Sequence, residues 1–190
     1  MIYFSSDLHL NHKNAIRFTQ RPFSSLDQMN RQLIENFNSI VKPKDTLYLL
    51  GDVCLFREKE KYEIESLINR LNGNKILVYG NHDDPETFEC YSDVAAYKEI
   101  KYHRRKLVLF HYPIVNNEWN GGYGHGKEMG KKNRKNASIM LHGHIHSKGP
   151  HYNRENRRKD IFKYDVGVDA NDYKPVSINE IFNFFHLSID

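Results

Sequence analysis

Short apolar runs rich in β-branched and aromatic residues recur along the chain and predict buried strands. These runs cover residues 2–6, 46–50, 75–79, 107–110 and 138–141. Two segments between the first three runs have the period of amphipathic helices. Their apolar stripes comprise Leu26, Met29, Leu33, Phe37 and Ile40 in the first segment, and Ile64, Leu67, Ile68 and Leu71 in the second. This alternation predicts an α/β fold, in which binding residues collect beyond the carboxyl ends of the strands.

The last part of the chain is expected to cover a sheet. Residues 164–169 predict a late strand, and Ser177 is the predicted N-cap of a closing helix. The apolar face of that helix carries Ile178, Ile181, Phe182 and Phe185. Because 190 residues suffice for one substantial core and are short for two, we expect a single domain over residues 1–190.

Composition narrows the class of protein. With 39% hydrophobic and 27% charged residues, the chain resembles an ordinary soluble protein. No apolar run approaches the roughly 20 residues that a membrane span needs. Met1 leads directly into the first predicted strand instead of a signal sequence. Cys54 and Cys90 lie far apart and outside any CxxC pattern, so we expect a cytoplasmic protein without disulfides.

Polar residues follow each of the five predicted strands at the point where the strand ends. They are Asp7-Leu8-His9, Gly51-Asp52, Gly80-Asn81-His82-Asp83, His111 and Gly143-His144-Ile145-His146. Carboxylate, amide and imidazole groups without thiolates suit divalent ions such as Mn²⁺, Fe, Zn²⁺ or Mg²⁺. In an extended segment, residues i and i+2 point the same way. Asp7 with His9, and His144 with His146, are therefore expected to converge.

The order of these motifs resembles the calcineurin-like metallophosphoesterases. The match comprises Asp-x-His, Gly-Asp, Gly-Asn-His-Asp, His and Gly-His-x-His, and runs from Asp7 to His146. Five elements in one order are far more specific than a lone motif. The resemblance implies a four-layer α/β/β/α sandwich of two mixed sheets flanked by helices. It also implies two divalent metal ions, for which we favour Mn²⁺ over Fe, Zn²⁺, Ni²⁺ and Mg²⁺.

The resemblance further assigns ligands to both metals. One ion would be held by Asp7, His9, Asp52 and His146, and the other by Asp52, Asn81, His111 and His144. Asp52 would bridge the two ions. The implied reaction is hydrolysis of a phosphodiester or phosphomonoester through a metal-bridging hydroxide. A small nucleotide-like ester is the expected substrate on a separate ground, namely the aromatic and arginine residues that could line a substrate groove.

Three neighbouring residues are assigned catalytic roles. The resemblance gives His82 contact with the phosphate or protonation of the leaving group, with the Asn81 amide helping to offset negative charge. Asp83 could orient the His82 ring and raise its pKa. His142 is interpreted as supporting the ligands, without binding metal itself.

Weaker hypotheses concern contacts with the substrate. The candidates are His12, Arg17 and Tyr112, followed by Arg21, Trp119 and Tyr123. His12 begins a predicted helix and could meet a phosphate, whereas the others could bind phosphate or stack on a base. For each residue taken singly, packing or simple exposure is an equal or more frequent explanation.

The charge distribution leaves other functions open. Residues 121–159 hold ten Lys and Arg against two Glu, although the whole chain has a net charge of only +4. A nuclease could use this segment to hold nucleic acid, but a solvated loop would have the same composition. A catalytically silent binding scaffold is the second alternative, and the complete set of candidate ligands disfavours it. No protein partner is predicted.

Overall fold

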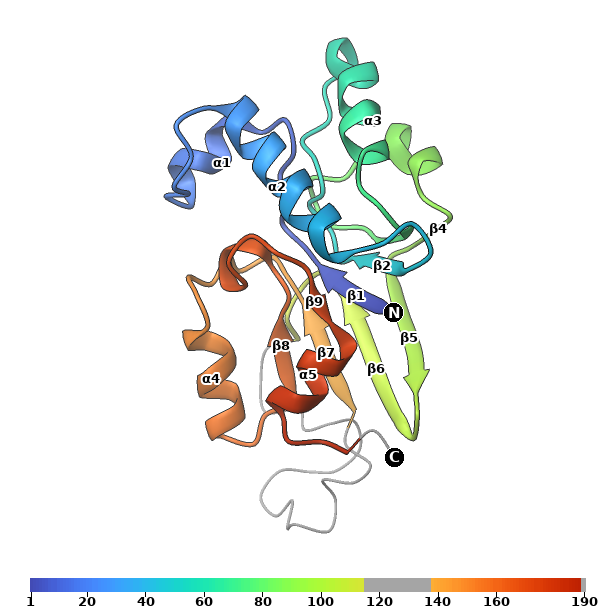
Figure 1. Ribbon diagram of the computed structural model, residues 1–190, viewed down its shortest axis with the longest axis vertical. Coiled ribbons are helices and arrows are strands. Elements are labelled where there is room, and N and C mark those ends of the chain that lie inside the picture. The colour runs from blue at the N-terminus through green and yellow to red at the C-terminus, as the bar shows by residue number, and fades with distance from the viewer. Residues whose placement is uncertain (115–137, 189–190) are drawn as a thin grey trace.

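The computed structural model describes residues 1–114 and 138–188, which form two mixed sheets with helices packed against them (Figure 1). The first sheet has the order β4-β3-β2-β1-β9. Its strands are β1 (Ile2–Ser5), β2 (Thr46–Leu49), β3 (Asn74–Val78), β4 (Asp93–Ala95) and β9 (Val176–Ser177). The second sheet, β5-β6-β7-β8, comprises β5 (Tyr97–Tyr102), β6 (Arg105–Phe110), β7 (Ile139–His142) and β8 (Lys163–Asp165).

Both sheets contain parallel and antiparallel pairs. Strands β1 to β4 are parallel neighbours, whereas β9 runs antiparallel to β1. In the second sheet β5 is antiparallel to β6, and β6, β7 and β8 are parallel. The predicted α/β class with two mixed sheets flanked by helices is confirmed, and each of the five predicted early strands is present.

The helices are α1 (Lys13–Phe18), α2 (Leu26–Ile40), α3 (Lys61–Asn69), α4 (His151–Arg158) and α5 (Ile178–Phe184). Short 3-10 helices span Glu58–Glu60, Pro85–Cys90 and Val168–Ala170. The predicted stripes of α2 and α3 pack on one face of the first sheet, where Leu33 and Ile64 are fully buried with Leu47 of β2. This burial explains why both segments alternate apolar and polar residues with helical period.

A second core lies between the two sheets. Phe4 and Tyr48 of the first sheet share it with Leu109 of β6 and Leu141 of β7. Phe182 of α5 is also fully buried in this core. The predicted N-cap of α5 is confirmed, since Ser177 forms a capping box with Glu180.

The structure corrects the predicted late strand at residues 164–169. Strand β8 ends at Asp165, because the Asp165 carboxylate accepts a hydrogen bond of 2.8 Å from the backbone N–H of Gly167 and turns the chain. Residues Val168–Ala170 then form a 3-10 helix. Strand β5 and helix α4 were not predicted. Strand β5 alternates exposed and half-buried positions, and α4 has the sequence HYNRENRR without an apolar stripe.

The carboxyl ends of strands from both sheets meet at one edge. The ring of His111, which follows β6, pairs through Nδ1 with the carbonyl oxygen of Leu50 after β2 at 2.8 Å. The N–H of Asp7 after β1 donates to Gly51 O at 3.0 Å, and Gly143 N donates to His111 O at 3.0 Å. These links join the polar segments that follow the strands. Within the described ranges, the helices are all too short or too polar to cross a bilayer.

Candidate metal centre

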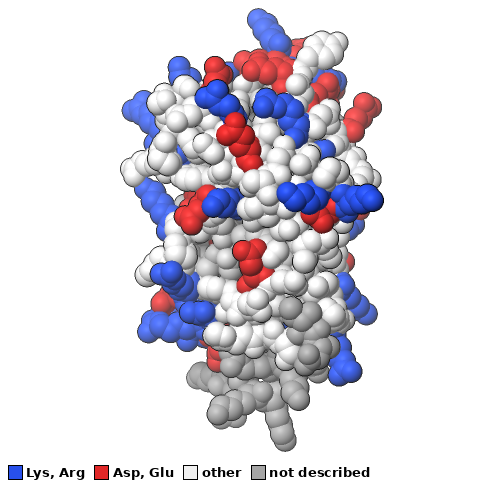
Figure 2. Space-filling view, in the orientation of Figure 1, with Lys and Arg blue, Asp and Glu red and all other residues white. Residues whose placement is uncertain are grey.

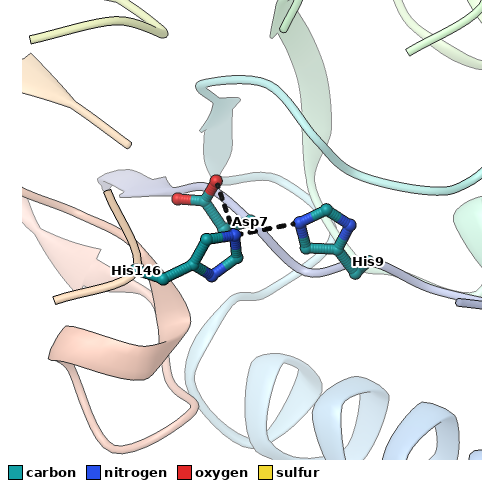
Figure 3. A group of neighbouring side chains, drawn as sticks. All are labelled: Asp7, His9 and His146. Carbon is teal, nitrogen blue, oxygen red and sulfur yellow. Dashed lines mark hydrogen bonds and ion pairs between the residues drawn. The ribbon is translucent and has the colours of Figure 1, made fainter. Parts of the chain in front are cut away.

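One group of potential metal ligands consists of Asp7, His9 and His146 (Figure 3). Asp7 and His9 follow β1, whereas His146 follows β7 in the other sheet. His9 Nε2 lies 3.2 Å from His146 Nε2, which is 4.0 Å from Asp7 Oδ1. The candidate ligand atoms all lie within 4.8 Å of one another, as the ligands of a single ion do.

A second group consists of Asp52, His111 and His144. His144 Nδ1 lies 3.2 Å from His111 Nε2, and His111 Nε2 lies 3.5 Å from Asp52 Oδ1. The side-chain oxygen of Asn81 is 3.3 Å from the same His111 nitrogen. The structure thus brings together the four residues that the resemblance assigns to the second metal.

The Asp52 carboxylate faces both groups. Its Oδ2 lies 3.7 Å from His9 Nε2, and its Oδ1 lies 3.5 Å from His111 Nε2. Asp52 is 2% exposed, so its charge cannot be balanced by bulk water. A single carboxylate therefore lies between the two groups.

The convergence of these side chains has a different origin from the predicted one. Asp7, His9, Asp52, His144 and His146 all adopt left-handed backbone conformations, with φ of 57°, 51°, 54°, 73° and 46°. The i, i+2 alternation of an extended strand therefore does not explain the pairing. His144 and His146 in fact belong to different groups. Left-handed backbone at non-glycine residues costs about 1 kcal/mol or more each and is concentrated at functional sites.

Glycines allow backbone to approach the carboxylates closely. A Cβ atom on Gly143 would lie 2.2 Å from Ser6 Oγ and 2.5 Å from Asp7 Oδ2. On Gly80 it would lie 2.4 Å from Asp52 Oδ1. Both glycines belong to the predicted motifs, and side chains at these positions would displace the candidate ligands.

The electrostatics of the first group fit a bound cation. Burial raises the pKa of Asp7 to about 7, with neighbouring carboxylates adding to the effect. Burial lowers the pKa of His9 to about 2, so its ring is neutral and has a lone pair for a metal. A fully buried carboxylate beside another carboxylate is costly unless a positive charge lies nearby. The donor set and its burial therefore match a hard or borderline divalent ion.

Asp169 and Arg21 hold His146 in place. Asp169 Oδ2 lies 2.8 Å from His146 Nδ1, so Nε2 is the nitrogen that faces Asp7 and His9. Arg21 donates from Nε and from one terminal nitrogen to the two Asp169 oxygens, each at 2.9 Å. Burial would raise the pKa of Asp169, but hydrogen bonds from His146 and Arg21 keep it below its ordinary value.

Sequence reasoning missed Asp169 and misplaced Arg21. Arg21 is 4% exposed and also donates to the backbone carbonyls of Asp7 and Leu8. It therefore supports the loop after β1 that carries Asp7 and His9, here called the ligand loop, and does not line a substrate groove. Asp169 comes four residues after the observed end of β8 at Asp165, just as the other site residues follow the ends of their strands. The interpretation of residues 164–169 as one strand hides this signal, because it places Asp169 inside the strand.

His12 supports His9 in a similar way. The Nδ1 atoms of the two rings are 3.1 Å apart. The other nitrogen of His9, Nε2, therefore faces His146 of the first ligand group. We predict that His12→Ala weakens metal binding about tenfold to a hundredfold, because the His9 ring loses the partner that fixes its orientation. Competition with a chelator would measure this change. Lys13→Ala, an exposed neighbour, is the matched control, and equal affinity of both variants would contradict the role of His12.

The remaining predicted catalytic residues lie at the junction of the groups. The backbone N–H of His82 donates to Asp52 Oδ1 at 3.0 Å, and the His82 ring centroid lies 5.2 Å from that of His9. The Asp83 carboxylate accepts hydrogen bonds from the backbone of Asp52, Val53 and Gly80. Asp83 thus ties together the loops after β2 and β3, a different task from the predicted orientation of the His82 ring.

The weaker substrate candidates are dispersed. Arg17 is exposed on α1, while the Tyr112 ring packs edge-on against His111 and His144 with both centroid distances 4.8 Å. Trp119 and Tyr123 lie outside the described residues. His142 is fully buried behind the site and pairs through Nδ1 with the Gly143 carbonyl at 3.0 Å, in keeping with a supporting role.

Two mixed sheets with two groups of Asp and His side chains at their shared edge define an α/β sandwich that carries candidate metal ligands. The sequence profile of the calcineurin-like phosphoesterase superfamily domain matches residues 1–162, and the chain belongs to this superfamily.

Three relatives extend the comparison. The uncharacterised protein MJ1445 of Methanocaldococcus jannaschii is 34% identical, over 95% of this chain and 88% of that protein. The Gene 66 protein of Mycobacterium phage L5 is 26% identical, over 88% of this chain and 86% of its own length. A crystal structure of a protein of unknown function, AQ665 from Aquifex aeolicus, aligns with a TM-score of 0.72 at 29% identity. That alignment covers 96% of this chain and 98% of AQ665.

Proposed function

We propose that the protein is a binuclear metal-dependent hydrolase of small phosphoesters, either phosphodiesters or phosphomonoesters. The observation that carries this proposal is the position of Asp52, whose two oxygens lie 3.7 Å from His9 Nε2 and 3.5 Å from His111 Nε2. A carboxylate between two imidazole-rich groups suits two adjacent ions better than one. Membership in a phosphoesterase superfamily supports the reaction class.

Two divalent ions at this centre would supply an activated water and positive charge near the phosphoryl oxygens. Asp7, His9, Asp52 and His146 would hold one ion, and Asp52, Asn81, His111 and His144 the other. Mn²⁺ remains our favoured ion, with Fe, Zn²⁺, Ni²⁺ and Mg²⁺ as alternatives that the same ligand set accommodates.

The side chain of His82 is the candidate proton donor. Its ring lies beside those of His9 and His12, with centroid distances of 5.2 and 5.8 Å. Because the backbone N–H of His82 donates to Asp52 Oδ1, the backbone that carries the ring stays next to the carboxylate between the two ligand groups. From there it would contact the phosphate and protonate the leaving oxygen. Asp83 would act as a positioning residue for the loops that carry Asp52 and His82.

The nuclease alternative depends on the basic segment 121–159. Residues 121–137 lie outside the described part of the chain. In the remainder, Arg158 and Lys159 pair with Glu155 at 2.8 and 3.0 Å, and the Arg157 guanidinium lies 4.7 Å over the Phe184 ring. Figure 2 shows Lys and Arg distributed among Asp and Glu on the face that it displays. These contacts favour a small substrate, and steep salt dependence of activity would favour nucleic acid.

Two predictions about the whole protein also remain proposals. The single-domain organisation rests on the chain length and on the two cores that share the first sheet. The cytoplasmic location rests on Cys54 and Cys90, which are free thiols.

A side-by-side ester assay tests the proposed function. Metal-stripped protein would be refilled with Mn²⁺ and supplied with bis-p-nitrophenyl phosphate or p-nitrophenyl phosphate. We expect metal-dependent release of p-nitrophenol, and the preferred ester distinguishes a phosphodiesterase from a phosphatase. Folded protein that hydrolyses neither ester with Mn²⁺, Ni²⁺, Zn²⁺ or Mg²⁺ would support the scaffold alternative instead.

A further inference from the structure

A cavity of about 270 Å³ adjoins the metal centre on the side of α1. One wall consists of imidazole rings from His9, His12, His82 and His146. The rest of the lining comes from α1 and its carboxyl end, namely Ala15, Phe18 and Thr19. Since His9 and His146 belong to the first ligand group, a molecule in the cavity would lie directly beside the ion held there.

The wall formed by α1 is apolar. Ala15 contributes a methyl group, and the Thr19 hydroxyl already donates to the Ala15 carbonyl at 2.8 Å. Phe18 is 72% exposed, although it is the largest apolar side chain of α1. An isolated exposed phenylalanine is ordinary, but one on the rim of a cavity beside a metal centre offers its free surface to a ligand.

The imidazole wall is aromatic, and the residues that line the cavity include no Lys, Arg, Asp or Glu. The rings of His9, His12 and His82 pack against one another with centroid distances of 5.0 to 5.8 Å. Aromatic faces and edges attract other planar rings. A charged group such as a second phosphate would find no side chain of permanent opposite charge on these walls.

The volume limits the size of the ligand. A cavity of about 150 Å³ lined by apolar residues accommodates benzene, whereas drug-sized ligands occupy roughly 300–1,000 Å³. At about 270 Å³, this cavity has room for one planar ring and its linking atoms, and it is too small for several nucleotides of a polymer.

We propose that the cavity binds an uncharged planar aromatic group attached to the phosphate of the substrate, with Phe18 as the specificity-determining contact. This inference rests on the proposed function and adds the chemical class of the ester. The aromatic group is either a simple aryl group or the base of a nucleoside, and both would lie between Phe18 and the imidazole wall.

Binding of stable phosphonates tests the inference without requiring turnover. Zn²⁺-refilled protein labelled at the methyl groups of Ala15 and Thr19 would be titrated with phenylphosphonate or methylphosphonate and followed by NMR. We expect phenylphosphonate to shift both methyl signals and to bind about tenfold more tightly, the fold-change typical of one ring contact. A nucleoside 5′-phosphonate forms the third arm, and tighter Phe18-dependent binding there identifies a nucleotide as the source of the ring.

Variants of one residue complete the test. Phe18→Ala should abolish the advantage of phenylphosphonate, and Phe18→Tyr should retain it because the ring remains. Tyr62→Ala, which removes an 87% exposed ring on α3 outside the cavity, should bind like the unmodified protein. Equal affinity for the two simple phosphonates, no binding of either, or an undiminished preference in Phe18→Ala would overturn the inference. Absence of ester hydrolysis with the phosphonate preference intact would instead overturn only the proposed function.

Discussion

Replacing Asp52 with Asn is expected to reduce phosphoester hydrolysis at least about 10³-fold, the upper end of the loss seen when one electrostatic stabiliser is removed. The amide keeps the shape of the side chain but loses the negative charge that faces both ligand groups. One of its two ends also becomes a donor, which cannot bind a cation. Initial rates with Mn²⁺ at saturating p-nitrophenyl ester would measure the loss.

The same variant should fold at least as stably as the unmodified protein when metal is absent. The buried Asp52 carboxylate contributes to raising the pKa of Asp7. Removing its negative charge therefore relieves repulsion between the carboxylates of Asp52 and Asp7. Asp172→Asn is a matched control because Asp172 is exposed and has a φ of 52°, close to the 54° of Asp52. A large loss of thermal stability in metal-free Asp52→Asn, or an equal loss of activity in Asp172→Asn, would contradict the proposed role.

Truncation of Arg21 is expected to cause the largest loss of stability. Its side chain is 0% exposed and pairs with Asp169 at 2.9 Å. It also donates to the carbonyls of Leu8 and Asp7 at 2.8 and 2.6 Å. Arg21→Ala leaves a buried carboxylate and two carbonyls without these donors, so we expect the free energy of unfolding to fall by about 3–5 kcal/mol. Thermal unfolding of the metal-free protein would show a midpoint lower by roughly 10 °C.

Two further variants locate the cause of that loss. Arg17→Ala removes an exposed arginine from the neighbouring helix α1 and should change the free energy of unfolding by less than about 0.5 kcal/mol. Arg21→Lys keeps a positive charge but cannot form both parallel hydrogen bonds to Asp169, so an intermediate loss is expected. If Arg21→Ala unfolds at the same temperature as Arg17→Ala, Arg21 does not support the ligand loop.

Helices α2, α3 and α5 and the central strands could be predicted, because their buried apolar residues recur at a regular spacing along the sequence. Leu33 of α2 and Ile64 of α3 occur at helical spacing and lie in one core, which is the basis of the periodicity signal. Strand β5 was missed because alternating exposed and half-buried residues at a sheet edge give a weak apolar signal. Helix α4 was missed because it contacts β8 through polar residues such as Asn153, whose side chain donates to the Asp165 carbonyl.

The sequence indicates which residues gather at the candidate site better than it indicates the backbone geometry that brings them together. The family resemblance assigns Asp7, His9 and His146 to one ion, and the structure brings these three side chains together. The left-handed backbone that makes them converge has no simple sequence signature, since Asp and His adopt it less readily than glycine. Asp169 and Arg21 lie 148 positions apart in the sequence, and only the fold brings them together beside His146.

Stepwise metal loading, followed together with hydrolysis, tests the binuclear proposal most directly. Metal-free protein would be titrated with Mn²⁺ while bound metal per chain and cleavage of bis-p-nitrophenyl phosphate and p-nitrophenyl phosphate are measured at each addition. We predict that two ions bind per chain and that hydrolysis of the preferred ester rises mainly with the second ion, because Asp52 must contact both. Full activity with one ion per chain, or binding that stops at one ion, would contradict a binuclear centre.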